Sequence, residues 1–133
     1  MSHSLLKQAA VAFILAFTAQ EATAQLETPQ PSPKGKIEQK VGVMNVTVSY
    51  SRPSVKGRKI FGDLVPFGQE WRTGANEPTT ITFSDPVKIE GQDLPAGTYS
   101  LYTIPQEQEW TVIINKKASG PPRDAKEDAV SFK

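Results

Sequence analysis

Apolar and polar residues alternate with a period of two along most of the chain beyond residue 36. Such alternation is typical of strands that bury one face and expose the other. Ile37–Val41 and Met44–Tyr50 alternate on either side of Gly42 and predict a β-hairpin. The same pattern predicts strands at Thr79–Ser84 and Pro86–Glu90. No segment beyond residue 25 keeps a helical period for three turns, so we expect an all-β domain.

Two later segments, Thr98–Ile104 and Trp110–Asn115, carry apolar residues on both faces. Strands of this kind lie centrally in a sheet that is covered on both sides. Short strands separated by Gly and Pro turns predict an antiparallel β-sandwich of jelly-roll or immunoglobulin-like type. A polar loop, Lys116–Asp128, follows, and a further alternation opens at Ala129–Lys133.

The first 24 residues have the pattern of a secretory signal peptide. Lys7 precedes an apolar run, Ala9–Phe17, and Ala22-Thr23-Ala24 is a small-x-small cleavage site. Cleavage after Ala24 predicts a secreted or periplasmic protein without an integral membrane segment. Residues 25–36 alternate proline with polar residues and predict an extended tether, so the single domain is expected at 37–133.

Composition and charge exclude several classes of chemistry. The chain has no cysteine, and its one histidine, His3, lies in the predicted signal peptide. A Ser-His-Asp triad, a cysteine nucleophile and a His- or Cys-ligated metal site are therefore excluded from the mature chain. The net charge of +1 provides no field that would attract nucleic acid. No catalytic, cofactor-binding or metal-binding residues are predicted.

Residues 51–78 form a connection of 28 residues without clear periodicity. Loops of this length in a compact domain are usually functional. A guanidinium next to an indole, with amide and carboxylate groups nearby, is able to hold an anion or a sugar hydroxyl. The candidate ligand-binding residues are Arg52, Lys56, Arg58, Trp71, Arg72, Asn76 and Glu77.

Simpler interpretations of the same residues remain open. Arg72 is also able to pair internally with Glu70 or Glu77 and so fasten the loop. The basic cluster is equally typical of a solvated surface. Aromatic residues on strands, such as Tyr99 and Tyr102, more often belong to a core than to a stacking platform.

Several long motifs follow one another between residues 51 and 116. They are S-R-P-S-V-K-G-R-K-I-F-G, L-V-P-F-G, W-R-T-G-A-N-E, L-P-A-G-T-Y-S-L-Y-T-I-P and E-W-T-V-I-I-N-K. Over about Ser32 to Lys116 the chain thus resembles the bacterial domain of unknown function DUF2911. The resemblance implies an exported all-β domain with no established activity, substrate or cofactor. It also implies further strands beyond the polar loop, so we expect C-terminal strands of the sandwich to be missing here.

The sequence leaves the function unknown and supports three hypotheses. The preferred one is a secreted or periplasmic binding or interaction module that uses loop 51–78. Its partner would be a glycan, a small anion or another envelope protein. The second is a small glycan-active hydrolase or lyase with Arg72 as anchor and Glu70 and Glu77 as acid and base. The third is a purely structural envelope protein.

Overall fold

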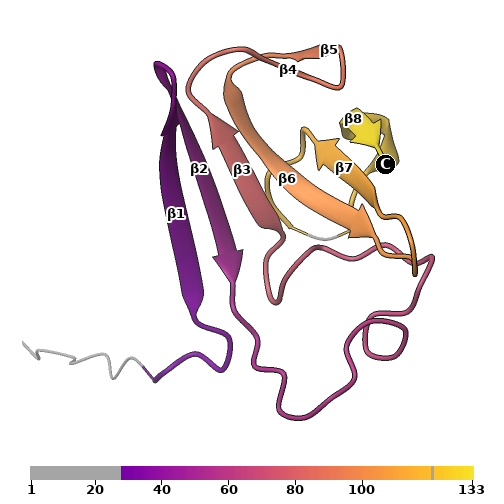
Figure 1. Ribbon diagram of the computed structural model, residues 1–133. Coiled ribbons are helices and arrows are strands. Elements are labelled where there is room, and N and C mark those ends of the chain that lie inside the picture. The colour runs from indigo at the N-terminus through magenta and orange to yellow at the C-terminus, as the bar shows by residue number, and fades with distance from the viewer. Residues whose placement is uncertain (1–27, 121) are drawn as a thin grey trace, which may run out of the picture.

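The computed structural model describes residues 28–120 and 122–133, and its fold is all-β (Figure 1). The predicted signal peptide, residues 1–24, lies outside the described residues. Within the described ranges no helix is long and apolar enough to cross a membrane. The strands are β1 (Lys34–Val41), β2 (Met44–Ser51), β3 (Thr79–Phe83), β4 (Val87–Ile89), β5 (Gln92–Leu94), β6 (Gly97–Ile104), β7 (Thr111–Asn115) and β8 (Asp128–Phe132), and a short 3-10 helix, η1 (Ala125–Glu127), precedes β8.

Six strands form one antiparallel sheet in the order β1-β2-β3-β6-β7-β8, and β4 pairs with β5 separately. The predicted first hairpin is confirmed, with Gly42 at a φ of 61° in its two-residue turn. Strands β3, β4 and β7 also lie within the segments predicted for them, and β6 begins one residue before its predicted segment. β1 begins at Lys34, inside the segment expected as a tether, and β5 occupies a segment for which no strand was predicted.

One face of the sheet, called here the hairpin face, packs against the β4–β5 hairpin. Phe83, Tyr99, Ile114 and Val130 extend from this face and form one buried cluster with Leu94 of β5. Each of the five side chains is at most 7% exposed. Burial of a large apolar side chain contributes about 1.5–3 kcal/mol, so this cluster stabilises the fold substantially.

The opposite face, called here the Tyr102 face, is also covered over the central strands. Tyr102 and Ile113 are register partners across β6 and β7 and are 2% and 3% exposed. Tyr99 and Ile114 are similarly buried on the hairpin face. β6 and β7 are therefore covered on both sides, as their apolar residues predicted.

Coverage decreases toward the β1 edge of the sheet. Ile37 is 54% exposed, although it faces Val48 on the hairpin face. Within the described residues, the β4–β5 hairpin is the only second layer against this face. The all-β antiparallel class is confirmed, whereas a sandwich of two full sheets is not.

The connection between β2 and β3, residues 52–78, passes around one end of the sheet (Figure 1). It returns to the sheet at Trp71, which exchanges two backbone hydrogen bonds with Thr103 of β6, at 2.8 and 2.9 Å. The amide of Thr79 then donates to the carbonyl of Arg72 at 3.2 Å. The segment around Trp71 thus extends the line of β3 along β6.

Candidate functional site

A row of polar side chains crosses the Tyr102 face. The strand registers align, from β1 to β7, Lys36, Ser49, Thr80, Ser100 and Asn115. Residues that face each other in antiparallel strands share one face of the sheet, so these side chains lie next to one another. The two halves of this polar row have different surroundings.

The connection between β7 and β8 covers one half of the polar row. Ser100 and Asn115 are both 0% exposed. The Ser100 hydroxyl donates to the carbonyl of Lys117 at 2.6 Å. The Asn115 amide donates to the carbonyl of Asp124 at 2.8 Å, and its Oδ1 accepts from the amide of Lys117 at 3.0 Å. Hydrogen bonds therefore hold the connection over this half and satisfy its buried polar groups.

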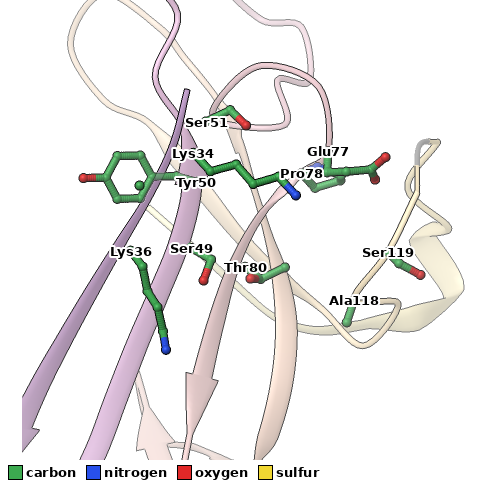
Figure 2. Close-up of a pocket in the computed structure, with 11 residues that line it drawn as sticks. Lys34, Lys36, Ser49, Tyr50, Ser51, Glu77, Pro78, Thr80, Ala118 and Ser119 are labelled. Atoms are coloured by element: carbon green, nitrogen blue, oxygen red, sulfur yellow. The ribbon is translucent and has the colours of Figure 1, made fainter. Parts of the chain in front are cut away.

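The other half of the polar row remains open and forms the floor of a trough of about 520 Å³ (Figure 2). Ser49 and Thr80 lie on the floor, and Lys34 and Lys36 of β1 form one rim. In Figure 2 the Lys34 side chain extends across the strands toward Pro78. The other rim combines the end of the long loop with the β7–β8 connection, through Glu77, Pro78, Ala118 and Ser119.

The trough combines one available cation with several hydroxyl groups. Lys36 is ion-paired with Glu38. In the part of the chain that the structure describes, Lys34 forms no ion pair within 4.0 Å. An ammonium group donates hydrogen bonds to anions, and serine and threonine hydroxyls both donate and accept. The trough therefore has the chemistry to hold a ligand that carries both negative charge and hydroxyl groups.

The segment that leads to Glu77 is held in a strained conformation. Thr73 and Asn76 have φ values of 58° and 59°, in the left-handed region. This region costs a β-branched residue such as Thr73 roughly 1–2 kcal/mol. Three contacts hold Thr73 there. Its hydroxyl lies 3.2 Å from that of Thr103 and donates to the carbonyl of Trp71 at 3.4 Å, and its carbonyl accepts from the Thr79 hydroxyl at 2.8 Å. Strain of this kind is frequent at ligand-binding sites.

A chain of ion pairs lies beside Tyr102. Arg123 Nε donates to Glu70 Oε2 at 2.5 Å, and Arg123 Nη1 donates to Asp128 Oδ2. These contacts join the end of the long loop to the β7–β8 connection and to the start of β8. Glu70 is thereby engaged in fastening the C-terminal segment, while Glu77 lies on the rim of the trough.

The surroundings of Tyr102 shift the ionisation of its phenol. Burial raises the pKa of the Tyr102 phenol, and the carboxylate of Glu70 raises it further. A hydrogen bond with Ser100 and the charges of Arg123 and Arg72 lower the same pKa, but burial and Glu70 together outweigh them. The net effect favours the neutral form of the phenol.

Trp71 and Arg72 point to opposite faces because they are neighbours in an extended segment. Trp71 is a register partner of Thr103 and packs with Phe61 and Trp110, at ring-centroid distances of 5.7 and 6.3 Å. Arg72 is exposed and forms no ion pair within 4.0 Å among the described residues. The structure thus shows no pairing of Arg72 with Glu70 or Glu77.

The three basic candidates at the start of the long loop lie apart from the trough lining. Arg52, Lys56 and Arg58 are exposed. Arg58 Nη2 and Nε donate to the carbonyls of Ser54 and Val55 in the same turn, at 2.7 and 3.0 Å. Asn76 is exposed on the strained segment. Of the seven candidates, Glu77 lines the trough directly.

Several lining residues were not among the sequence-based candidates, chiefly Lys34, Lys36, Ser49, Thr80 and Ser119. Lys34-Gly35-Lys36 already alternates with a period of two, which would have extended β1 into the proline-rich segment. The register with β2 then places these lysines beside serines. Ser119 carries no comparable signal, because it reaches the trough only through the path of the β7–β8 connection.

Comparisons with known proteins place the chain in a family without assigning an activity. The profile of the DUF2911 family, described as a protein of unknown function, matches residues 32–133. The match spans all eight strands, both rims of the trough and the ion-pair chain at Arg123. No curated protein and no solved structure shows a significant match. The chain therefore belongs to the DUF2911 family.

Proposed function

We propose that this protein is an exported binding module that holds an acidic glycan, or a similar hydroxyl-rich anion, in the trough on the Tyr102 face. Export rests on the residues at the N-terminus, where Lys7, the apolar run Ala9–Phe17 and the Ala22-Thr23-Ala24 site form a signal-peptide pattern. Binding rests on the open half of the polar row.

The observation that carries the proposal is the contrast between the two halves of the polar row. Ser100 and Asn115 are fully satisfied beneath the β7–β8 connection. Ser49 and Thr80 instead lie at the floor of an open trough. A carboxylate bound by Lys34 would place the hydroxyl groups of a sugar ring within reach of these side chains.

The rim opposite Lys34 suits the remaining surface of a sugar. Glu77 offers a hydrogen-bond acceptor for hydroxyl groups, while the half-buried Ala118 offers apolar contact for a ring face. An open trough suits an extended polymer better than an enclosed small molecule.

The two alternative hypotheses receive no comparable support. A glycan-active enzyme needs Glu70 and Glu77 to flank one bond, whereas Glu70 accepts from Arg123. A purely structural loop was expected to pair Arg72 with a glutamate, whereas Arg123 makes the ion pairs found here.

Calorimetric titration with an oligogalacturonate and with a neutral oligosaccharide of equal length tests the proposal. We expect the acidic oligomer to bind and the neutral one to bind more weakly. Lys34→Gln should weaken binding of the acidic oligomer about tenfold or more, because a charge-assisted hydrogen bond contributes about 1.5–3 kcal/mol. Thr80→Val, which removes one floor hydroxyl at constant shape, should weaken binding of both oligomers.

Lys126→Gln is the matched control, since Lys126 is an exposed lysine of η1 outside the trough. It should bind like the wild type. The proposal is wrong if neither oligomer binds, or if Lys34→Gln and Lys126→Gln reduce binding equally.

A further inference from the structure

β1 lies at one end of the sheet, and its outer edge has no partner strand among the described residues. It pairs with β2 over eight residues without a register shift, so the edge is long and regular. β8, at the other end, has five residues and a register irregularity beside it. Long regular edges are the places where sheets accept another strand.

The hairpin fixes which residues of β1 offer backbone groups to a new strand. Val41 and Met44 close the two-residue turn, so they form a hydrogen-bonded pair, and such pairs recur at every second residue. The amide of Arg52 donates to the carbonyl of Pro33 at 2.9 Å, which confirms that odd-numbered residues bond inward to β2. Even-numbered residues therefore direct their N–H and C=O groups outward. In an antiparallel pair, residues that direct their backbone groups toward the neighbouring strand lie opposite one another. If the new strand is a second copy of β1, its even-numbered residues must therefore lie opposite the even-numbered residues of the first copy.

The outward-bonding residues carry all of the charge on this strand. Lys34, Lys36, Glu38 and Lys40 lie on the Tyr102 face, and Gly35, Ile37, Gln39 and Val41 lie on the hairpin face. Ile37 and Val41 are each 54% exposed. A second copy of β1 offers the same two stripes, so twofold pairing brings charge to charge and apolar residue to apolar residue.

Several twofold registers place even-numbered residues opposite even-numbered residues. One of them sets opposite charges against each other and sets no like charges together. With a twofold axis at Gln39, Glu38 of each copy lies opposite Lys40 of the other, and Ile37 of each copy lies opposite Val41 of the other. An axis at Ile37 sets Lys36 opposite Glu38 but also Lys34 opposite Lys40. An axis at Glu38 sets Glu38 opposite itself and Lys36 opposite Lys40. Like charges directly opposite are destabilising.

We propose that the protein forms a twofold dimer in which two β1 strands pair antiparallel with the axis at Gln39. The occupant of the edge is thus a second copy of this chain. The dimer joins two sheets into one and covers Ile37 and Val41 with each other. Charge complementarity between Glu38 and Lys40 selects the register. This inference does not depend on the proposed ligand.

Gln39→Cys tests the register directly, because the chain has no cysteine of its own. At the axis, Gln39 faces its own copy in a non-hydrogen-bonded pair with a Cα separation of about 4.5 Å. This separation is compatible with a disulfide. Mild oxidation of the full chain should therefore convert most of the Gln39→Cys variant to covalent dimer.

Ile37→Cys is the matched control, since Ile37 is also exposed on the same face but faces Val41 of the second copy. It should give several-fold less covalent dimer than Gln39→Cys. Equal yields from both variants, or a higher yield from Ile37→Cys, would overturn the proposed register. Thermal melts of both reduced variants verify that each is folded.

Charge reversal provides an independent test by sedimentation velocity. Glu38→Lys places lysines opposite each other at two positions and should raise the dimer dissociation constant about tenfold. The double variant Glu38→Lys, Lys40→Glu restores opposite charges in this register and should return the constant to within about twofold of wild type. Glu107→Lys, in the exposed β6–β7 turn, makes the same change in net charge and should have no effect. A wild-type chain that stays monomeric at every concentration, or a double variant no better than the single one, refutes the dimer.

Discussion

Arg123 is the residue whose removal should test the tertiary structure most sharply. Its guanidinium bonds Glu70, 53 positions away in sequence, and Asp128 at the start of β8. The side chains of Arg123, Asp128 and Glu70 are 15%, 25% and 36% exposed. The hydrogen bond to Asp128, followed by that to Glu70, raises the pKa of Arg123 against an opposing effect of burial. The guanidinium therefore stays charged throughout the physiological pH range.

The expected loss in the free energy of unfolding follows from the number of hydrogen bonds that Arg123 makes and from their exposure to water. Arg123→Met keeps most of the aliphatic stem and removes two charge-assisted hydrogen bonds, each contributing about 1.5–3 kcal/mol when well shielded. Partial exposure of the carboxylates reduces this by about half, because water replaces part of each bond. Glu70 and Asp128 also lose their shared cation. We expect a loss of about 2 kcal/mol in the free energy of unfolding.

Urea denaturation measures this loss. With a slope of about 1–2 kcal/mol per M for a domain of this size, the midpoint should fall by about 1–2 M without a change in slope. Arg58→Met is the matched control, since Arg58 bonds only carbonyls of its own turn, and it should cost less than about 0.5 kcal/mol. A double-mutant cycle with Glu70→Gln should give a coupling of about 1 kcal/mol. Equal midpoints for Arg123→Met and Arg58→Met would refute the reasoning.

Three further predictions concern the core and the long loop. The pKa of Tyr102 lies above its ordinary value of 10.0, so its contribution to stability is complete below pH 10 and is lost as the pH rises through the folded-state pKa. Urea midpoints should consequently fall more steeply above pH 10 in the wild type than in Tyr102→Phe, and parallel curves would contradict this. Gly62→Ala should destabilise by about 1–2 kcal/mol in thermal melts, because Gly62 has a φ of 82° and a Cβ there would lie 2.7 Å from the Phe67 ring. Gly42→Ala has no such contact and should cost less. Ile114→Ala should lower the unfolding free energy by about 2–5 kcal/mol, since Ile114 is 3% exposed, and a smaller loss would place it outside the core.

The strands could be predicted from sequence where alternation extends over at least five residues. Ile37–Val41 and Met44–Tyr50 are clear because burial on one face imposes a period of two. β5, with only Gln92–Leu94, is too short to show a period. It forms because its pairing with β4 carries Leu94 into the core, which depends on tertiary contact.

The trough could not be predicted in the same way, because its residues come from four separate parts of the chain. Glu77 was found because the long loop suggested function, whereas Thr80 lies in a strand and carries no such signal. The registers of β1 with β2 and of β2 with β3 bring Lys36 and Thr80 to the same row. Arg123 lay in a segment interpreted as a polar loop, and its partner Glu70 is distant in sequence. Such pairings are set by topology, not by local pattern.

The proposed dimer and the proposed ligand make a joint prediction. A twofold axis that relates antiparallel strands of one continuous sheet is perpendicular to that sheet, so both troughs would open on the same side. A polymer long enough to reach both troughs should then bind more tightly than a short oligomer with identical sugar units, through effective concentration. Lys40→Glu sets Glu38 against a glutamate in the second copy while leaving the lining of each trough intact. It should abolish the advantage of the polymer and leave the affinity for the short oligomer unchanged. If the advantage persists in a variant shown to be monomeric, the polymer is bound along a single sheet and the two proposals are independent.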